Sequence, residues 1–598
     1  MQIRINDQLV ECQEGDTILT AAKRADIFIP TLCAYLPLNH TPGTCRVCLV
    51  EIVHPVTGEA TVVTSCNTPV SDGLIVQTRT ARVRKMQRQQ VAWLFADHNQ
   101  DCASCVRHGN CELQTVAMYT GLINNSCSGR FTAKRPIDTS SPSLFREANK
   151  CIRCGRCVEV CRTIQGLGCL TMDNIGTECG VGIAGADQWA DSTKCVNCGQ
   201  CTLVCPTGAL GLKNQTETAI EWMEDPEITT VVAFAPAVRV TMGDYFRLPP
   251  GTDVEKRIVT ALKHIGADYV CDINWAADVT IMEEGTELLH RLEEGGTLPM
   301  MTSCCPGWVN FVEKIHPELI AHLSTTRSPQ AIFGALAKTW FAREHGIDPK
   351  KLRFISIMPC TAKKDEAQRD QLARDGMPDT DLVLTVREFG DLLRRNGVHL
   401  GHLPDGEFDS PFMTQNTGAS VIFGVTGGVM EAAVRTVYAV LTGKELAPIE
   451  FQPVRGQDWV KEATVDLGDK GTIKLAVVHT LAHAEKLCQL VKQGKADYHF
   501  VEVMACPGGC INGGGTVRRK NRYMEFNEQR AAAIYAIDEK RPLRQSHKNP
   551  DVVRLYEEFL GEPCGHASHD LLHTHYKMRK RNPKPQSITD IWKKVQLG

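Results

Sequence analysis

Two adjacent cysteines lie in the run Thr302-Ser303-Cys304-Cys305-Pro306-Gly307-Trp308, and two later runs likewise combine cysteine with proline. These are Met358-Pro359-Cys360-Thr361-Ala362-Lys363-Lys364 and Met504-Ala505-Cys506-Pro507-Gly508-Gly509-Cys510. Each run follows an apolar segment, at 299–302, 354–358 and 499–503, with the composition of a buried strand. Ligating groups in α/β folds gather beyond the carboxyl ends of strands, so we expect these cysteines to converge on one pocket. Ordinary buried thiols are the alternative, because free cysteine is often buried.

The chain around these runs has the pattern of a large α/β domain. Further buried strands are predicted at 231–235 and 475–478, and helical patterns separate the strands. Pro236 directly follows the first of these strands. The domain is predicted to span residues 228–576, and residues 577–598 are predicted to form a basic C-terminal tail.

The composition limits the possible classes of protein. A chain of 598 residues is too long for one core, and a net charge of −3 argues against nucleic acid or an anionic membrane as a partner. The 27 cysteines come without a recognisable signal peptide or transmembrane helix. We therefore expect a reducing, cytoplasmic location, in which clustered cysteines serve as metal ligands.

A first ligand set follows an alternating segment at 2–12, which has a hairpin signal at Asn6-Asp7, and a helix that Asp16 is predicted to cap. Four thiolates with loop spacing suit a 2Fe–2S cluster or a zinc site. The hairpin and helix resemble those of a plant-type, β-grasp ferredoxin. This resemblance implies a 2Fe–2S domain over residues 1–78. Its ligands would be Cys33, Cys45, Cys48 and Cys66.

A second set combines one histidine with three cysteines: His98, Cys102, Cys105 and Cys111. Taken alone, it fits a structural zinc site as well as a 4Fe–4S cluster. Its position between two cysteine-rich modules resembles the His-ligated 4Fe–4S segment of iron–sulfur hydrogenases and of the large peripheral subunit of respiratory NADH dehydrogenase. The resemblance implies a small 4Fe–4S domain over residues 79–140.

The third module contains two cysteine runs with the same spacing, and it is predicted to be a ferredoxin-like domain over residues 141–215. In two-cluster ferredoxins the fourth cysteine of each run binds the other cluster. Arg162 replaces the usual proline after the first run, which affects a turn and no ligand. One 4Fe–4S cluster is therefore expected on Cys151, Cys154, Cys157 and Cys205, and the other on Cys195, Cys198, Cys201 and Cys161.

A glycine run between these two sets, Gly180-Val181-Gly182-Ile183-Ala184-Gly185, has the G-x-G-x-x-G pattern. No strand of a βαβ unit visibly precedes it, and the chain has no G-x-x-x-x-G-K-[ST] loop. Nucleotide binding by this chain is therefore not expected. The four predicted clusters, arranged in series, would form an electron path that needs a catalytic centre at its end.

The runs at 302–308, 358–364 and 504–510 are, in this order, similar to the signatures of FeFe (iron-only) hydrogenases, and the resemblance covers nearly the whole chain. It implies reversible interconversion of protons and H2 at an H-cluster. This cofactor is a 4Fe–4S cubane joined through a cysteine thiolate to a diiron centre with CO, cyanide and a bridging dithiolate amine.

The same resemblance implies a role for individual residues of the three runs. Cys305, Cys360, Cys506 and Cys510 would ligate the cubane, and Cys510 would bridge to the diiron centre. Lys363 would hydrogen-bond a cyanide. The other neighbours of the diiron unit would be Pro236 and Gln330, near the diatomic ligands, and Met358 and Met504, as apolar sulfur contacts.

Cys304 is the predicted first proton carrier, because it is adjacent to a ligand and a tuned thiol can titrate near neutrality. Glu284 and Glu287 lie three residues apart, on one face if 283–293 is helical. With Ser324 and Arg291 they match the path to the surface that is proposed for the family. Without the resemblance, the two carboxylates would be interpreted as a solvated helix face.

The remaining cysteines have packing as their default role: Cys12, Cys127, Cys169, Cys179, Cys271, Cys488 and Cys564. A fifth metal site at Cys564 with His566, His569, His573 and His575 is not favoured, because His573-Thr574-His575-Tyr576 resembles the C-terminal end of the hydrogenase family. The tail after Tyr576 is expected to be solvated, with docking to a partner subunit as the alternative. Its basic residues are Lys577, Arg579, Lys580, Arg581, Lys584, Lys593 and Lys594.

Two other classes of protein share parts of this pattern. A non-catalytic electron-transfer subunit would lack the three downstream cysteine runs. Sensory relatives typically lose the thiol that this chain keeps at Cys304, and assembly-type relatives lack the full N-terminal array. The layout resembles the catalytic subunit of NAD(P)-linked, often electron-bifurcating, hydrogenases, and stand-alone ferredoxin-linked enzymes are nearly alike. Expected partners are therefore ferredoxin, or flavin- and NAD(P)-binding subunits in a hetero-oligomer.

Overall fold

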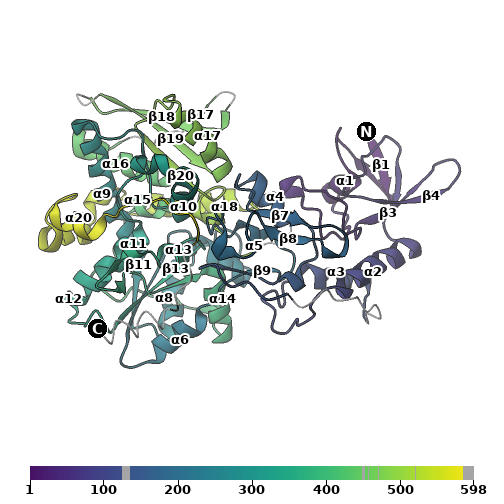
Figure 1. Cartoon of the computed structure of the whole chain (residues 1–598), viewed down its shortest axis with the longest axis horizontal. Coiled ribbons are helices and arrows are strands. Elements are labelled where there is room, and N and C mark those ends of the chain that lie inside the picture. The colour runs from purple at the N-terminus through teal and green to yellow at the C-terminus, as the bar shows by residue number, and fades with distance from the viewer. Residues whose placement is uncertain are drawn as a thin grey trace.

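The computed structural model describes residues 1–123, 135–446, 452–454, 457–468, 471–518, 520, 522–582 and 587. The chain forms a smaller lobe from its N-terminal third and a larger α/β lobe from the remainder, shown on the right and left of Figure 1. Four of the residues considered above lie outside the described part of the chain: Cys127, Lys584, Lys593 and Lys594.

The first N-terminal module is a five-stranded sheet with one helix, α1 (Ile18–Arg24). Its first two strands pair antiparallel around Asn6, which takes the left-handed φ of +53° that a tight hairpin requires. The predicted hairpin is therefore confirmed. In spatial order the strands are β2 (Gln8–Glu11), β1 (Gln2–Ile5), β5 (Ile75–Gln77), β3 (Leu49–Val53) and β4 (Ala60–Thr64).

The predicted cap of α1 is wrong by one residue. Thr17 is the N-cap: its hydroxyl accepts a hydrogen bond from Thr20 N, and Thr20 Oγ1 accepts one from Thr17 N. Asp16 instead accepts hydrogen bonds from Arg24 at the other end of the helix, at 2.7 Å. Of the predicted helix face, Ile18, Leu19 and Ala22 are buried, whereas Ala25 is the C-cap and is half-buried.

The second and third modules consist of short elements around cysteine loops. The run from Gly180 to Gly185 begins in an antiparallel hairpin, β7–β8, and not between a strand and a helix of a βαβ unit. The elements are α2 (Ala81–Ala96), α3 (Glu112–Thr120), β6 (Leu144–Arg146), α4 (Arg156–Thr163), β7 (Leu170–Asp173), β8 (Gly180–Ile183), α5 (Gln200–Val204) and β9 (Leu210–Leu212).

The larger lobe contains two sheets. The first is fully parallel, and its spatial order is β11 (Tyr269–Asp272), β10 (Thr229–Phe234), β13 (Leu352–Met358) and β16 (Leu382–Thr385). The second is parallel across its first three strands and antiparallel beyond them. Its order is β12 (Met300–Met301), β20 (Phe500–Met504), β19 (Thr472–His479), β18 (Gln457–Asp466) and β17 (Gln452–Val454). The five strands predicted from apolar runs are therefore confirmed, with shifted ends.

The long helix α9 (Ile273–Glu294) connects the two sheets. It contacts β10 of the first sheet and also α16 (Gly428–Thr442), which packs on β20 of the second. Asp272 caps its first turn by accepting a 3.0 Å hydrogen bond from Asn274 N, and Gly295 ends it with a φ of +81°. Residues 283–293 are thus helical, as predicted.

Shorter helices complete the lobe. Pro306 opens α10 (Pro306–Ile315), so Cys304 and Cys305 lie in the turn between β12 and this helix. The other helices are α6 (Thr216–Glu224), α7 (Val238–Thr241), α8 (Glu255–His264), α11 (Pro329–Leu336), α12 (Ala342–Glu344), α13 (Lys363–Glu366), α14 (Val386–Arg395), α15 (Gly418–Val421), α17 (Leu481–Lys492), α18 (Asn527–Lys540), α19 (Pro550–Leu555) and α20 (His566–Leu572). A two-stranded hairpin is formed by β14 (Ala373–Arg374) and β15 (Met377–Pro378).

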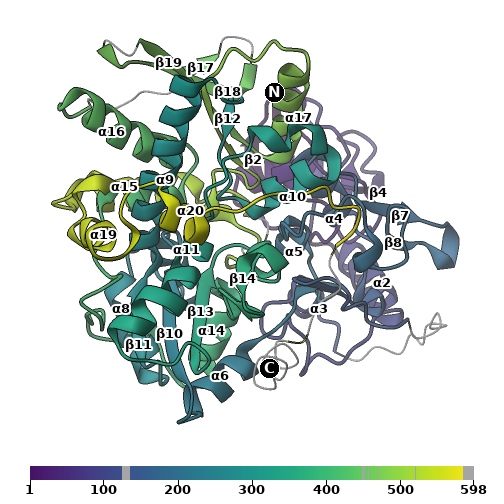
Figure 2. The same cartoon turned by 60° about the vertical axis from the view of Figure 1, so that its left-hand side comes forward.

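After α20 the chain runs back across the lobe past α10, as the yellow trace in Figure 2 shows. Arg579 donates hydrogen bonds of 2.6 Å to Asn310 Oδ1 and 3.0 Å to Asp365 Oδ1. Asn582 is buried against Trp189 and Asn197. The expectation of a solvated tail is therefore wrong for Arg579 and Asn582, whereas Lys577, Lys580 and Arg581 are exposed as expected. Among the described residues, no helix combines the length and apolar character needed to span a membrane.

Candidate active site

The four cysteines predicted to ligate the cubane come together where strands of both sheets end. Cys360 follows β13 by two residues, Cys506 follows β20 by two, and Cys305 is the N-cap of α10. Burial raises the pKa of the Cys360 thiol to about 12, and the charge of Cys305 acts in the same direction. Burial, and after it the charges of Cys360 and Cys305, also raise the pKa of Cys506 and of Cys510. The thiols thus lie close to one another, with Cys506 buried and the other three half-buried.

The loops around these thiols leave no room for larger residues. A Cβ atom on Gly513 would lie 2.3 Å from Pro359 O, and Gly509 has a φ of +95°. Two donors point at the sulfurs: Ala505 N lies 3.4 Å from Cys305 Sγ, and Gln200 Nε2 lies 3.3 Å from Cys506 Sγ. Buried thiols that receive N–H hydrogen bonds are suited to act as thiolate ligands of a metal cluster.

A positive charge lies beside this set. The Lys363 ammonium lowers the pKa of Cys360 and Cys510, although burial outweighs it at both thiols. Lys363 Nζ donates 2.8 Å hydrogen bonds to Ser328 Oγ and Glu366 Oε2. Three donors on an ammonium leave one N–H of Lys363 beyond these two bonds.

The other predicted neighbours of the diiron unit also lie at strand ends or on adjacent helices. Met358 and Met504 are the last residues of β13 and β20, and each is 3% exposed. Pro236 is buried in the turn after β10. Gln330 on α11 donates to Glu366 Oε2 at 3.1 Å and accepts from Ser356 Oγ at 2.9 Å.

Glu366, Ser328 and Gln200 also belong to this site and were not predicted. Glu366 holds Lys363, Ser328 and Gln330, and its spacing of three residues from Lys363 on α13 was a usable signal. Gln200 belongs to the ferredoxin-like module, so no local pattern could connect it to Cys506.

The predicted proton carriers lie along one face of α9 and the loop that precedes α11. Glu284 is 1% exposed, and its Oε2 has no hydrogen-bond partner among the described residues. Burial, followed by the charge of Glu287, raises its pKa from 4.5 to about 8. The alternative of a solvated helix face is therefore wrong. Cys304 lies close enough to Glu284 that this carboxylate, after burial, contributes to the raised pKa of the thiol.

The outer part of this group is a continuous hydrogen-bonded set. Ser324 Oγ donates to Glu287 Oε2 at 2.7 Å, and Arg291 Nη2 donates to Glu287 Oε1 at 2.6 Å. Thr325 N adds a 3.0 Å hydrogen bond to Glu287 Oε2. The Arg291 side chain is 13% exposed, so the hydrogen-bonded set of Ser324, Glu287 and Arg291 reaches the protein surface.

Within each of the first two N-terminal ligand sets, the predicted ligands also lie close together. Cys33 and Cys45 exchange 3.4 Å contacts between backbone N and Sγ, and all four thiols of this set are buried. His98, Cys102, Cys105 and Cys111 line one hollow, and the buried His98 Nδ1 has no partner among the described residues. A buried imidazole nitrogen without a partner is suited to bind a metal.

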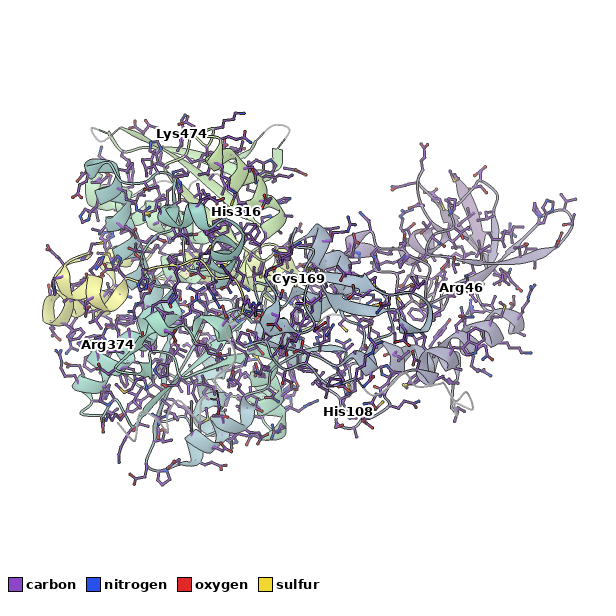
Figure 3. All side chains as sticks on the ribbon, in the orientation of Figure 1. Arg46, His108, Cys169, His316, Arg374 and Lys474 are labelled. Carbon is purple, nitrogen blue, oxygen red and sulfur yellow. The ribbon has the colours of Figure 1, made fainter. Side chains whose placement is uncertain are left out.

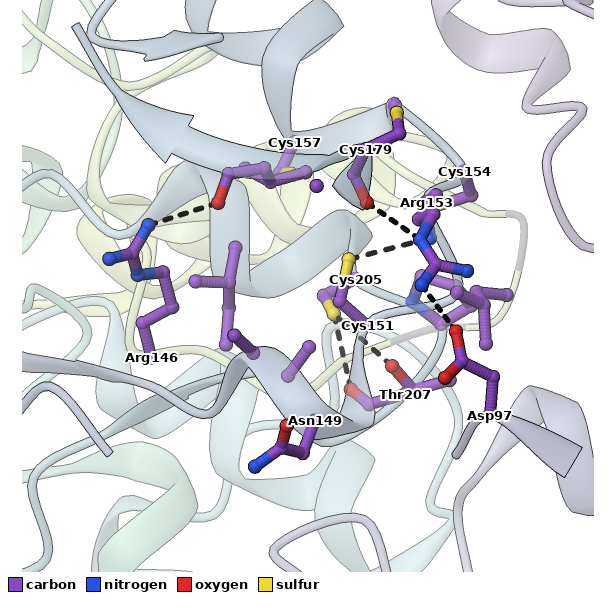
Figure 4. A pocket seen from close by; sticks show the side chains of 18 of the residues that line it. Asp97, Arg146, Asn149, Cys151, Arg153, Cys154, Cys157, Cys179, Cys205 and Thr207 are labelled. Carbon is purple, nitrogen blue, oxygen red and sulfur yellow. Dashed lines mark hydrogen bonds and ion pairs between the residues drawn. The ribbon is translucent and has the colours of Figure 1, made fainter. Parts of the chain in front are cut away.

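The ferredoxin-like module places the last thiol of its second run beside the first run. A cavity is lined by Cys151, Cys154, Cys157 and Cys205, three thiols of the first run and the last of the second (Figure 4). Burial, and after it the charges of Cys198, Cys195 and Cys161, raise the pKa of Cys201, so the other four thiols form a second group.

Both outer modules contact the ferredoxin-like module near its first cysteine run. His40 Nε2 of the first module donates to Cys154 O at 2.8 Å. The second module reaches the same region, because Glu112 N donates to Pro206 O at 3.1 Å and a Cβ on Gly208 would lie 2.5 Å from Cys105 Sγ. Both outer modules thus contact the surroundings of the cavity lined by Cys154 and Cys205, and they also pack against each other in an apolar cluster that contains Cys33, Cys45 and Leu113. Arg46 and His108, in the two outer modules, are labelled in Figure 3.

Most of the cysteines without an assigned role pack as expected, since Cys271 and Cys488 are buried in apolar cores. Cys169 lies at the junction of the lobes (Figure 3), where its Sγ is 3.3 Å from Ser192 Oγ. Cys179 lines the cavity of Figure 4 and accepts a 2.7 Å hydrogen bond from Arg153 at its carbonyl. Cys564 is close to Glu283 and His573.

Comparison with protein families divides the chain at similar points. Residues 228–514 match the C-terminal domain of the iron only hydrogenase large subunit, and 524–579 match the iron hydrogenase small subunit. Residues 1–81 match a 2Fe-2S iron-sulfur cluster binding domain, 87–125 the NADH-ubiquinone oxidoreductase-G iron-sulfur binding region, and 150–209 a 4Fe-4S dicluster domain.

Two relatives are similar over almost their whole length. The NADP-reducing hydrogenase subunit HndD of Solidesulfovibrio fructosivorans is 43% identical over 97% of this chain and 99% of its own. Iron hydrogenase 1 of Clostridium pasteurianum is 38% identical over 96% of this chain and 99% of its own. A solved structure of [FeFe]-hydrogenase HydA1 from Chlamydomonas reinhardtii is 39% identical, with a TM-score of 0.56, over 61% of this chain and 99% of that one.

Proposed function

Since this chain belongs to the iron-only hydrogenase family, and so interconverts protons and H2, we propose that Cys305, Cys360, Cys506 and Cys510 hold an H-cluster between the ends of its two sheets. When bound, this cofactor supplies the redox metal centre for 2H⁺ + 2e⁻ ⇌ H2. Cys510 is the proposed bridge to the diiron part. The observation that carries the proposal is the convergence of four thiols, at three of which, Cys305, Cys360 and Cys510, the Lys363 ammonium acts to lower the pKa.

The residues of the proposed diiron pocket would hydrogen-bond the cofactor, exclude water from it and border its diatomic ligands. The remaining N–H of Lys363 would hydrogen-bond a cyanide, while Ser328 and Glu366 keep its side chain in position. Met358 and Met504 would supply apolar contacts that exclude water. Gln330, fixed by Ser356 and Glu366, and Pro236 would border the other diatomic ligands.

The proposed electron route uses one 2Fe–2S and three 4Fe–4S clusters in a forked arrangement. The outer clusters, on Cys33, Cys45, Cys48 and Cys66 and on His98, Cys102, Cys105 and Cys111, would both feed the cluster on Cys151, Cys154, Cys157 and Cys205. The cluster on Cys195, Cys198, Cys201 and Cys161 would follow. The contact from Gln200 on α5 to Cys506 Sγ supports this last step to the catalytic lobe.

The proposed proton route starts at Cys304 and passes through Glu284, Ser324 and Glu287 to Arg291. It is supported by the bonds from Ser324 and Arg291 to Glu287 and by the unpartnered Oε2 of Glu284. A carboxyl group that is partly protonated at neutral pH can both accept and donate a proton, as a relay requires. The presence of Cys304 also favours a catalytic over a sensory role.

The proposed physiological setting is a cytoplasmic, NAD(P)-linked hetero-oligomer. Likeness over nearly the whole chain to an NADP-reducing hydrogenase subunit supports this setting. Flavin and pyridine-nucleotide chemistry would then belong to partner chains, with ferredoxin as a further electron partner. Pull-down from the native host followed by flavin analysis would test it, and recovery of the chain alone, linked only to ferredoxin, would contradict it.

The H-cluster assignment is testable without turnover. Anaerobically matured protein should show infrared bands of metal-bound CO and cyanide, and Cys510→Ala should lose them while it keeps the N-terminal clusters. Cys488→Ala, a buried thiol in the core beneath α17, is the matched control and should keep the bands. Unchanged bands in Cys510→Ala would contradict the assignment.

A further inference from the structure

Three side chains with metal-binding chemistry converge outside every ligand set described above. Glu283 lies on α9, Cys564 precedes α20, and His573 directly follows that helix. One ligand atom from each, a carboxylate oxygen, a thiol sulfur and an imidazole nitrogen, lies within 4.8 Å of the other two. Of the sequence cluster Cys564, His566, His569, His573 and His575, only Cys564 and His573 belong to this group, and Glu283 was not foreseen.

The distances from the histidine to the other two ligand atoms are close to those between neighbouring ligands of one ion, within about 0.4 Å. His573 Nε2 lies 3.0 Å from Glu283 Oε2 and 3.9 Å from Cys564 Sγ. Ligands at about 2.0 to 2.3 Å from a tetrahedral zinc ion are about 3.3 to 3.8 Å apart. The Glu283 side chain is fully buried and that of His573 is 2% exposed, whereas Cys564 is half-buried.

Neighbouring side chains hold these ligands in the required orientation. Thr325 Oγ1 is 2.8 Å from His573 Nδ1, which leaves Nε2 directed at Glu283 and Cys564. The Tyr556 hydroxyl donates to Glu283 Oε1, and Cys564 N donates to Oε2 at 2.7 Å. Metal-binding histidines and carboxylates in proteins are typically fixed in this way by hydrogen bonds at their other polar atoms.

We propose that Glu283, Cys564 and His573 bind a zinc ion, with water as the fourth ligand. A mixed sulfur, nitrogen and oxygen donor set suits Zn²⁺ better than Mg²⁺ or Ca²⁺, which prefer oxygen alone. One carboxylate and one thiolate neutralise the two charges of the ion, so the site avoids burying net charge. The ion would replace the hydrogen bond between Glu283 and His573 by bonds to both.

The ion would join two parts of the catalytic lobe. Glu283 lies in the segment that matches the hydrogenase large subunit, whereas Cys564 and His573 lie in the segment that matches the small subunit. Thr325, which holds His573, also donates its N–H to Glu287. A zinc ion here would therefore fasten the C-terminal segment to α9 and fix the backbone beside Glu287.

Metal analysis tests the proposal directly. Protein produced in zinc-supplemented medium, purified anaerobically and desalted should retain one zinc per chain. Cys564→Ala should retain less than a tenth of that, with unchanged iron content. Cys488→Ala, which removes a buried thiol far from these residues, should retain zinc as the wild type does. Wild-type protein without zinc, or equal zinc in Cys564→Ala, would overturn the proposal.

X-ray absorption at the zinc K-edge of the wild-type protein needs no variant. The proposal expects one sulfur near about 2.3 Å and the remaining ligands as nitrogen or oxygen near about 2.0 to 2.1 Å. Zinc misplaced in an iron–sulfur site would show three or four sulfur neighbours, and zinc held at surface histidines would show none. Either of these results would contradict the site.

Discussion

Gln200 Nε2 lies 3.3 Å from Cys506 Sγ, although the two residues are 306 positions apart in the chain. Gln200 is on α5, beside the proposed last cluster of the electron route, and Cys506 is a proposed ligand of the H-cluster cubane. The amide is held in place, because its Oε1 accepts from the Tyr523 hydroxyl and its Nε2 also donates to Asn512 O at 2.9 Å. This contact connects the electron route to the catalytic lobe.

Replacing Gln200 by leucine should lower the reduction potential of the cubane. An N–H donor at a thiolate sulfur favours the more negative, reduced state of a cluster, and its removal costs about 1 kcal/mol, or about 40 mV for one electron. EPR-monitored redox titration measures the shift. Gln165→Leu is the control, because this equally buried amide donates at 3.0 Å to Ala505 O and not to a sulfur. Equal potentials in both variants would contradict the role of Gln200.

Cys304→Ala should leave every cluster in place and remove most turnover. Cys304 lies between the proposed H-cluster site and Glu284, and removal of a positioned proton donor typically costs about 10²- to 10⁴-fold in rate. Iron content and H2 evolution with a reduced dye measure the two effects separately. Near wild-type H2 evolution would contradict the relay.

Glu287→Gln should slow H2 evolution about 100-fold while cluster content stays unchanged. The amide keeps the size of the side chain but cannot release and regain a proton between Ser324 and Arg291. Glu294→Gln on the same helix is the matched control, because Glu294 is exposed and lies outside this hydrogen-bonded set. An equal loss in both variants would indicate damage to α9 and not to the route.

Much of this architecture could be predicted from the sequence, because cysteine spacing and apolar runs are local signals. The strands before Cys360 and Cys506 and the exchange of Cys161 and Cys205 between the two groups of ferredoxin thiols are of this kind. Other features depend on how distant segments of the chain pack together. These are the proposed fork at Cys154 and Pro206, the contact from Gln200 to Cys506, and the approach of Glu283 to Cys564. Such packing cannot be predicted from the spacing or periodicity of residues along the chain.

The pH dependence of protein stability should reveal the raised pKa of Glu284. Burial and the charge of Glu287 raise its folded-state pKa from 4.5 to about 8, so the folded protein keeps a proton that the unfolded chain releases. Its stabilising contribution is complete below pH 4.5 and is lost as the pH rises through about 8, by at most about 1.4 kcal/mol per pH unit. The melting temperature of the wild type relative to Glu284→Gln should therefore fall across this range and level off above it. A constant difference would contradict the raised pKa.

The fork predicts that the 2Fe–2S cluster can exchange electrons when the His98 cluster is missing. In a series that follows chain order, loss of the middle cluster would cut the first module off. In the structure the first module has its own contact, from His40 to Cys154 O. In Cys102→Ala exposed to H2, the 2Fe–2S cluster should therefore become reduced at the wild-type rate, as freeze-quench EPR would measure. Cys154→Ala, which removes a ligand at the junction, should slow reduction of both outer clusters. A 2Fe–2S cluster that stays oxidised in Cys102→Ala would contradict the fork. Electrons would then have to pass through the His98 site to reach the first module, as in a linear series.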